Sequence, residues 1–261
     1  MFHFFPKAAF VLALVGAMIA STVDAHAGHR LDQIMKSNTL RVGTPGDYRP
    51  FAILENEQYV GHDIELIQKM ADVYGWKVDF VRSNWADLEK DLAADKFDIA
   101  VGGISRSTGR FLQHDFLPAY APYAKVALIN KKNKDRFTTL ESLNRPDVRV
   151  IKNPGGSNEQ FVDTYLIDAQ VTTVEDNSEI PAMIAEDQGD VMITENPEAI
   201  LYARKYPELY VAFMDNPLTP VNYMGFMLPD DDPDYSRVMN YLWNLMELRG
   251  VVRALDAKWI K

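Results

Sequence analysis

The run NPGGSNEQF, residues 153–161, stands between a strand-like segment at residues 148–151 and a helix-like segment that follows. Its two glycines allow the backbone to turn sharply without steric obstruction. Ser157 and Asn158 come at the expected helix start, where backbone N–H groups have no partner inside the helix. A strand, a glycine turn and a helix N-terminus together form a cradle for a carboxylate or a phosphate. We therefore predict an α/β lobe that binds a small anion at this turn.

The alternation of strands and helices extends over the rest of the chain. Strands are predicted at residues 40–43, 77–81 and 97–101, with helices at residues 64–74 and 85–94. Later strands are predicted at residues 125–130, 171–174 and 191–194, and a long helical tail at residues 235–260. This alternation is typical of α/β proteins, whose parallel sheets bind ligands at the carboxyl ends of their strands. The strand at 125–130 is expected to carry the chain into a second lobe.

Residues 1–27 have the features of a secretory signal peptide. Lys7 precedes an apolar run at residues 8–20, and small residues follow at alternating positions from 23 to 27, as at a cleavage site. The apolar run is too short to cross a bilayer, which favours a cleaved leader over a membrane span. No later run is long and apolar enough to span a membrane, so we expect a periplasmic protein without a membrane partner.

Composition and charge exclude several classes of function. The 261-residue chain is 47% hydrophobic and 25% charged, which suits a globular protein with a full core. It has no cysteine, so disulfide and thiolate chemistry are excluded. The formal net charge of −10 and the lack of a basic patch argue against a nucleic-acid partner. His62 and His114 have no second ligand at metal spacing, and no nucleotide-type glycine loop occurs, so we expect neither a metal nor a cofactor.

Several short motifs resemble those of the periplasmic amino-acid-binding proteins of transport systems. They are Leu40-Arg41-Val42-Gly43, Gly61-x-Asp63, Trp85, Phe97-Asp98-Ile99, Gly103-x-Ser105 with Arg110, and the turn at residues 153–161. The resemblance implies an α/β protein with the two-lobed, type II periplasmic-binding-protein fold and a ligand cleft between the lobes. The first lobe would comprise residues 28–126 plus 217–261, and the second residues 127–216.

Within that superfamily, the sequence is more similar to the cyclohexadienyl dehydratases. The shared motifs are Gly46-Asp47-Tyr48-x-Pro50-Phe51, Ser83-x-Trp85, Lys125, Asn153-Pro154-Gly155-Gly156-Ser157-Asn158-Glu159 and Thr194-x-x-x-Glu198-Ala199. The glycine turn and the position of Glu198 are the more specific parts. This family converts prephenate, and usually arogenate, to phenylpyruvate or phenylalanine. The resemblance therefore implies an enzyme that acts on a small-molecule dicarboxylate.

Glu198 follows the strand at residues 191–194 and comes directly after Pro197, a residue at home in the first turn of a helix. From the bare sequence, an acid at this place most often complements the helix dipole. The resemblance instead makes Glu198 the general acid that protonates the departing C4 hydroxyl of prephenate. That role needs a carboxyl group that stays protonated near neutral pH, and nearby negative charge from Glu195, Asp47 or the substrate can achieve this.

The resemblance also gives functions to residues that have ordinary explanations. Arg110 is either a solvated helix arginine or, as we favour, a bidentate clamp on a substrate carboxylate. Lys125 is either solvated at a strand edge or faces the cleft and stabilises the anionic substrate. Asn158 caps a helix and, by resemblance, also contacts the reacting part of the ligand. Trp85 is a core anchor or a wall of the pocket. The other implied substrate contacts are Asp47, Tyr48, Gly103, Ser105, Gly156 and Ser157.

Glu195 departs from the pattern of the resemblance. In the amino-acid-binding relatives, an Asp usually stands at this position and pairs with the ammonium group of the ligand. The longer Glu195 is expected to intrude further or to pair differently, which favours prephenate over the amine-bearing arogenate.

The sequence leaves more than one function open. Our main hypothesis is a periplasmic dehydratase without a cofactor, in which Glu198 is the acid. The alternative is an amino-acid-binding subunit of an ABC transporter, with Glu195 and Arg110 as the charge pair for the ligand. An extracellular sensor module is a weaker third hypothesis, and association into a homo-oligomer stays open.

Overall fold

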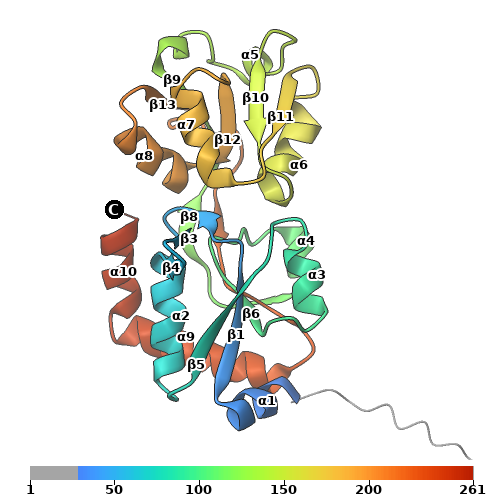
Figure 1. Ribbon diagram of the computed structural model, residues 1–261, viewed down its shortest axis with the longest axis vertical. Coiled ribbons are helices and arrows are strands. Elements are labelled where there is room, and N and C mark those ends of the chain that lie inside the picture. Colours follow the sequence, from blue (N-terminus) through green and yellow to red (C-terminus); the bar gives the residue numbers. More distant parts are fainter. Residues whose placement is uncertain (1–28, 261) are drawn as a thin grey trace, which may run out of the picture.

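The computed structural model describes residues 29–260, which form two lobes stacked end to end (Figure 1). The predicted signal peptide lies outside the described residues. Each lobe contains a five-stranded sheet with helices packed against it. This two-lobed α/β architecture is the one that the sequence led us to expect.

The first lobe is built mainly from the N-terminal half of the chain. Its helices there are α1 (His29–Ser37), α2 (His62–Asp72), α3 (Leu88–Ala93) and α4 (Thr108–Phe111). Its main sheet has the strand order β5-β1-β6-β15-β7, formed by β1 (Thr39–Thr44), β5 (Lys77–Arg82), β6 (Ile99–Ala100), β7 (Asp115–Phe116) and β15 (Met227–Leu228). A small antiparallel sheet contains β2 (Asp47–Tyr48), β3 (Ala52–Glu55) and β4 (Gln58–Val60).

The second lobe has the sheet order β11-β10-β12-β9-β13. Its strands are β9 (Lys125–Asn130), β10 (Arg149–Lys152), β11 (Gln170–Thr173), β12 (Val191–Glu195) and β13 (Leu209–Ala212). Its helices are α5 (Leu140–Leu143), α6 (Gly156–Tyr165), α7 (Ile180–Ala185) and α8 (Asn196–Lys205), with the 3₁₀ helices η1 (Lys131–Asn133) and η2 (Asn177–Glu179).

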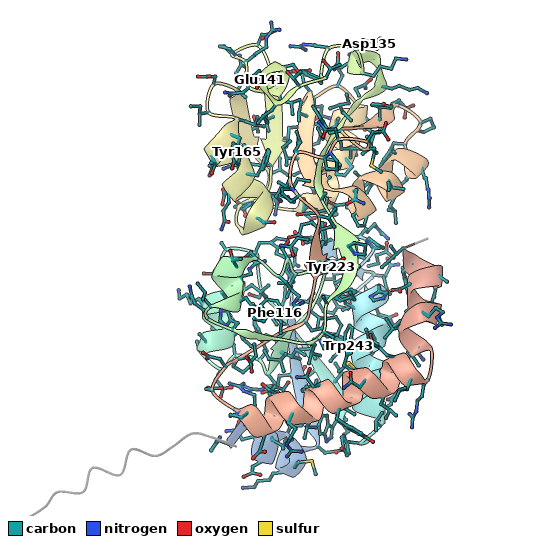
Figure 2. The ribbon with its side chains drawn as sticks, turned by 180° about the vertical axis from the view of Figure 1, so that it is seen from behind. Phe116, Asp135, Glu141, Tyr165, Tyr223 and Trp243 are labelled. Carbon is teal, nitrogen blue, oxygen red and sulfur yellow. The ribbon has the colours of Figure 1, made fainter. Side chains whose placement is uncertain are left out.

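Two strands connect the lobes. β8 (Tyr120–Tyr123) leads into the second lobe and β14 (Asn222–Met224) leads back, and the two pair antiparallel. Tyr223, on the returning strand, lies where the lobes meet (Figure 2). β9 begins at Lys125, directly after this connection, so Lys125 is placed at the boundary between the lobes.

Both sheets are mixed, whereas the alternation of strands and helices predicted parallel sheets. β1 pairs parallel with β5 and β6, but β15 pairs antiparallel with β6 and β7. In the second sheet, β9 pairs antiparallel with β12 and β13. The exceptions follow from the connections, because β9 and β15 continue the strands that cross between lobes and are not parts of β-α-β units.

The predicted helical tail is two helices, α9 (Pro233–Leu248) and α10 (Val251–Trp259). Gly250 separates them in the left-handed conformation, with φ of 71°. Glycine adopts this conformation without the steric cost that other residues pay, so it ends α9 and lets α10 turn back along α2.

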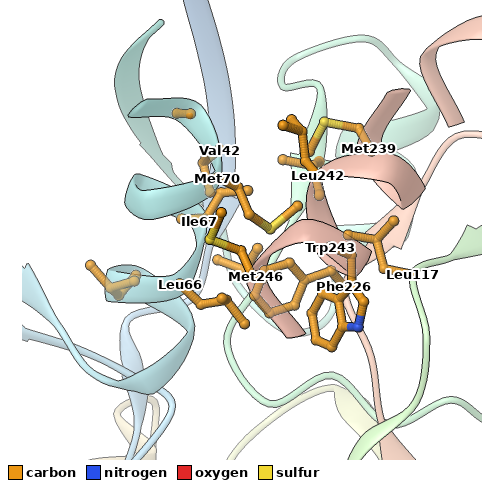
Figure 3. Close-up of a cluster of buried hydrophobic side chains, with 14 of the residues drawn as sticks. Val42, Leu66, Ile67, Met70, Leu117, Phe226, Met239, Leu242, Trp243 and Met246 are labelled. Carbon is orange, nitrogen blue, oxygen red and sulfur yellow. The ribbon is translucent and has the colours of Figure 1, made fainter. Parts of the chain in front are cut away.

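A buried apolar cluster joins α2 to α9 (Figure 3). Ile67 and Met70 of α2 face Trp243 and Met246 of α9, and each of these side chains is at most 2% exposed. Complete burial of such a side chain contributes about 1.5–3 kcal/mol, so this cluster makes the first lobe a firm support for its loops.

Candidate active site

Glu195 and Glu198 lie where β12 passes directly into α8. Glu195 is the last residue of the buried strand, and Pro197 occupies the first turn of the helix, where its fixed φ and missing N–H are tolerated. Glu198 lies in the same turn, as predicted. Glu195 is 2% exposed and Glu198 is 0% exposed, so both carboxyl groups are withdrawn from solvent.

Lys125 stands directly opposite Glu195 in the antiparallel pair of β9 and β12. Its Nζ donates to Glu195 Oε1 over 2.9 Å, to Ser157 Oγ over 3.1 Å and to Asn158 Oδ1 over 2.5 Å. Asn158 Nδ2 in turn donates to Glu195 Oε2 over 3.3 Å. The strand register therefore brings Lys125, Glu195 and the start of α6 into one buried cluster.

The glycine turn before α6 packs against the first lobe. Gly155 has φ of 79°, and a Cβ atom there would lie 2.3 Å from the backbone N of Ala86. Only glycine permits this approach of two backbones. The helix predicted at residues 85–94 begins only at Leu88, which leaves Trp85 in a turn beside the glycines.

A small cavity lies between the lobes at this cluster. Its lining residues are Tyr48, Trp85, Gly103, Ser105 and Arg110 from the first lobe, and Asn153, Gly155, Gly156, Ser157, Asn158, Asn177 and Glu195 from the second. Three predicted site residues lie one layer behind this lining. Lys125 contacts Glu195, Glu198 contacts Asn177, and Asp47 contacts Trp85.

The lobes contact each other directly across the cavity. Tyr48 Oη donates to Glu195 Oε2 over 2.6 Å, and the hydroxyl oxygens of Ser105 and Ser157 are 3.4 Å apart. Asn177 Nδ2 donates to the backbone oxygen of Asp47 over 3.3 Å. The structure is therefore a closed form in which predicted site residues of opposite lobes contact one another.

Arg110 lies in α4 and is 7% exposed. Its Nε donates to Glu89 Oε1 over 2.9 Å, and its Nη1 donates to the backbone oxygen of Ser105 over 3.3 Å. Ser107 caps the helix by accepting from the backbone N–H of Arg110. These contacts fix the planar guanidinium at the cavity wall, in a form suited to a carboxylate.

The carboxyl group of Glu198 is surrounded by neutral partners. Thr194 Oγ1 contacts its Oε2, and Asn177 Nδ2 donates to its Oε1 over 2.8 Å. Burial raises the pKa of Glu198 well above its ordinary value, and the charges of Glu195 and Asp47 raise it further. Nearby negative charge was the expected cause of a protonated carboxyl group, but desolvation is the larger cause of the raised pKa.

Glu195 has the opposite electrostatics. Burial alone would raise its pKa, but the Lys125 ammonium and hydrogen bonds from Tyr48, Lys125 and Asn158 together hold the pKa of Glu195 below its ordinary value. Two carboxyl groups in neighbouring positions thus have pKa values shifted in opposite directions, that of Glu195 downward and that of Glu198 upward. Such divergence is typical of catalytic carboxyl pairs.

Asp47 is a third buried carboxyl group at the junction. Its Oδ1 accepts from Trp85 Nε1 over 2.9 Å, and its Oδ2 accepts from the backbone N of Asn177 over 3.4 Å. Burial raises the pKa of Asp47 to about 6, against the lowering effect of these hydrogen bonds. Trp85 meets the Tyr48 ring edge-on, so the two rings form an aromatic wall of the cavity.

Sequence reasoning gave no function to Asn177 or to Thr194. Thr194 belongs to the motif that carries Glu198, and a hydroxyl one helical turn before an acid is a usable signal. Asn177 lies in a polar turn without any periodic pattern, and only the closed arrangement of the lobes brings it to Glu198. Its Oδ1 is buried with no hydrogen-bond partner among residues 29–260, and a buried acceptor that stays unpaired costs about 1–3 kcal/mol.

Among residues 29–260, no group of three or more His, Cys, Asp or Glu side chains is arranged to hold a metal ion. Within the same range, no helix combines the length and apolarity needed to cross a membrane.

Residues 40–261 match the bacterial extracellular solute-binding proteins, family 3. The chain belongs to this family. Cyclohexadienyl dehydratase of Pseudomonas aeruginosa is 33% identical over 253 residues, which cover 96% of this chain and 92% of that protein. A probable amino-acid ABC transporter-binding protein of Haemophilus influenzae is 24% identical over 257 residues, covering 97% of this chain and 96% of the relative.

The similar solved structures are of the same two kinds, amino-acid-binding proteins and dehydratases. The ancestral amino acid-binding protein AncCDT-1, described as a precursor of cyclohexadienyl dehydratase, is similar with a TM-score of 0.79 and 34% identity, over 88% of this chain and 99% of the other. A proline-to-leucine variant of an ancestral cyclohexadienyl dehydratase, AncCDT-3, has 42% identity and a TM-score of 0.53, over 88% of this chain and 96% of the other. The family of extracellular solute-binding proteins thus includes both binders and homologues of an enzyme.

Proposed function

We propose that the protein is a cyclohexadienyl dehydratase that converts prephenate to phenylpyruvate, with arogenate as a weaker substrate that yields phenylalanine. The observation that carries the proposal is the buried Glu198, whose pKa is raised by burial. It lies one residue behind a cavity that has Arg110 at its wall and Lys125 directly behind its lining. The identity to the Pseudomonas aeruginosa enzyme over most of both chains supports it.

In the proposed mechanism, Arg110 and the glycine turn hold the two carboxylates of prephenate while the lobes close, and the positive charge of Lys125 behind the lining stabilises the anion. Glu198 donates a proton to the C4 hydroxyl oxygen, and the C4–O bond breaks as water leaves. The ring carboxylate departs as carbon dioxide, and the electron pair of its C–C bond completes the aromatic ring. Glu198 then regains a proton from solvent. Closure excludes water and strengthens each charge interaction during these steps.

The contacts of Glu195 support prephenate over arogenate. Its two oxygens accept from Lys125, Tyr48 and Asn158, so the carboxylate is already neutralised and hydrogen-bonded. An ammonium group of arogenate would have to displace one of these partners to pair with Glu195. The keto group of prephenate is uncharged and does not have to displace a partner of Glu195.

We also propose a periplasmic location. The leader-like residues 1–27 and the match to an extracellular family support it. Prephenate would then have to reach the enzyme outside the cytoplasm.

The test is to incubate the purified mature protein with prephenate and to follow phenylpyruvate. Wild-type protein is expected to form it, and Glu198→Gln is expected to lose roughly 10²–10⁴-fold in rate, as for removal of a general acid. Turnover that survives Glu198→Gln would refute the mechanism, and a lack of turnover by the wild type would refute the activity.

A second candidate is an amino-acid-binding subunit of an ABC transporter. The ionised Glu195 at the cavity, with Arg110 at the opposite wall, favours it because an amino acid carries one charge of each sign. Thermal unfolding in the presence of each amino acid tests this candidate. A large stabilisation by one amino acid, together with no reaction of prephenate, would favour a binding protein.

A further inference from the structure

Asn177 occupies the junction of the cavity, Glu198 and the opposite lobe. It opens η2, lines the cavity and is 2% exposed. Its side chain touches the proposed acid and the first lobe at once, through Glu198 Oε1 at 2.8 Å and the backbone oxygen of Asp47 at 3.3 Å.

The orientation of the Asn177 amide is fixed by these partners. The backbone oxygen of Asp47 can only accept a hydrogen bond, so the amide nitrogen must face it. Nδ2 has two hydrogens, and Asp47 and Glu198 take both. Oδ1 is left as an acceptor that is buried without a partner among the described residues, a condition that native interiors rarely tolerate.

The ammonium group of the cluster is already engaged. The three hydrogens of Lys125 Nζ are directed at Glu195, Ser157 and Asn158. Because Asn177 lines the cavity, a ligand bound there can supply the donor for its Oδ1. In prephenate, the carboxylates and the keto group carry no hydrogen to donate, which leaves the hydroxyl group at C4 as the donor.

We propose that Asn177 Oδ1 accepts a hydrogen bond from the C4 hydroxyl of the substrate while its Nδ2 holds Glu198 in place. The inference rests on the proposed dehydratase function and assigns a substrate-binding residue to it. A single amide would thus align the leaving group with the acid that protonates it. When the C4–O bond breaks, the oxygen keeps the bonding electron pair, takes the proton of Glu198 and leaves as water, its original hydrogen still directed at Oδ1.

The test measures binding without turnover. A ring-saturated analogue of prephenate keeps both carboxylates and the C4 hydroxyl but cannot become aromatic, and its 4-deoxy counterpart lacks only the hydroxyl. Calorimetric titration of wild-type protein with both is expected to give about fivefold tighter binding of the hydroxy analogue, the size of one neutral hydrogen bond. Asn177→Leu, which has similar volume and no acceptor, is expected to bind the two analogues equally.

Asn130→Leu is the matched control. Asn130 is a buried asparagine of the same lobe whose Nδ2 donates to the backbone oxygen of Ala185, and it does not line the cavity. This variant loses a buried amide elsewhere and is expected to keep the wild-type ratio of the two affinities. If Asn177→Leu does not fold, Asn177→Ala replaces it, with the same expected loss of the ratio.

The outcomes separate the inference from the proposed function. If the wild type turns over prephenate but the Asn177 variant keeps the fivefold ratio, the hydroxyl contact is wrong and the dehydratase stands. If the ratio is lost as expected while the wild type forms no phenylpyruvate, the contact stands and the reaction does not. A wild type that binds neither analogue overturns both.

Discussion

At the scale of single residues, Glu195 and Glu198 are equally buried and differ in their partners. Glu195 accepts hydrogen bonds from the Lys125 ammonium, the Tyr48 phenol and the Asn158 amide. Glu198 contacts only the neutral side chains of Thr194 and Asn177 among its hydrogen-bond partners in residues 29–260. Burial without a cation raises the pKa of Glu198, whereas the Lys125 ammonium lowers the pKa of Glu195 despite its burial. The assignment of the acid follows from these partners and not from sequence position.

The first prediction concerns the pH dependence of the reaction. Only protonated Glu198 can donate, and its pKa is raised, so activity is expected to persist at neutral pH and to fall as alkaline pH ionises the group. Thr194 lowers that pKa through its hydrogen bond, so Thr194→Val should move the alkaline limb to higher pH. Steady-state kcat measured from neutral to alkaline pH checks both points, and a flat profile in the wild type would contradict them.

The second prediction concerns the pair of Lys125 and Glu195. Lys125→Met leaves the Glu195 carboxylate buried without its cation, which should raise the pKa of Glu195 and lower the free energy of unfolding by roughly 3 kcal/mol. Adding Glu195→Gln should restore much of this loss, because no unpaired charge remains. Urea unfolding of the two single variants and the double variant measures the coupling.

Lys132→Met is the control for that cycle. Lys132 pairs with Asp187 in the same lobe, but their side chains are 55% and 46% exposed. Its removal should change the free energy of unfolding by less than about 1 kcal/mol, because exposed ion pairs are screened by water. An equal loss of unfolding free energy in Lys125→Met and Lys132→Met would show that the buried pair contributes no more to stability than the exposed one.

At the scale of elements, α10 is fastened to α2 by a buried histidine. His62 Nδ1 lies 2.8 Å from Asp63 Oδ1, and its Nε2 lies 3.0 Å from Asp256 Oδ1. Asp63 also accepts from the backbone N–H groups of Gly102 and Gly103, which lead into the cavity wall. Hydrogen bonds through His62 and Asp63 therefore link the contact between α2 and α10 to the loop that carries Ser105.

The third prediction uses this contact. Burial opposes the charge of His62, but hydrogen bonds to Asp256 and Asp63 raise its pKa to about 9 from 6.5. A raised pKa stabilises the fold below pH 6.5, and that contribution is lost as pH rises through 9. The loss should be roughly 3 kcal/mol for a shift of this size.

Chemical unfolding at several pH values tests it with two variants. His62→Gln should remove the decline in stability at alkaline pH and lower stability at neutral pH. His114→Gln should keep the decline, because burial lowers the pKa of His114 and it is already neutral in that range. A wild-type stability that does not change between pH 6.5 and 9 would be inconsistent with a charged His62.

Local patterns were sufficient to predict most elements and part of the site. The strand, glycine turn and helix around Gly156 are as expected, and Glu198 lies in the predicted helix turn. The break at Gly250 was missed because a single glycine interrupts an otherwise continuous apolar period. The function suggested here for Asn177 could not be predicted, since its partners are 21 and 130 residues away and meet it only through the tertiary fold.

At the scale of the whole molecule, closure of the lobes joins the two halves of the site. The fourth prediction is that Tyr48→Phe weakens the closed form in the absence of ligand. The variant loses the hydrogen bond to Glu195 but keeps the ring that packs on Trp85 and Phe51. One such bond to a charged group contributes about 1.5–3 kcal/mol, enough to shift a two-state equilibrium more than tenfold.

Small-angle X-ray scattering measures the effect as the radius of gyration. The ligand-free variant should be more extended than the wild type, and a saturating dicarboxylate ligand should bring both to the same compact value. Equal radii without ligand would mean that the Tyr48 contact does not hold the lobes together.

The hydrogen bond between Tyr48 and Glu195 has one more consequence, for the entry of any guest molecule. The phenol and the carboxylate already satisfy each other, so an arriving molecule competes with the protein's own side chains for the same space and the same partners. The measured affinity would then understate the strength of the ligand contacts, because part of the binding free energy goes into opening the closed form. A mutation that removes the competing bond between Tyr48 and Glu195 would then raise the affinity for a ligand without adding any contact to that ligand.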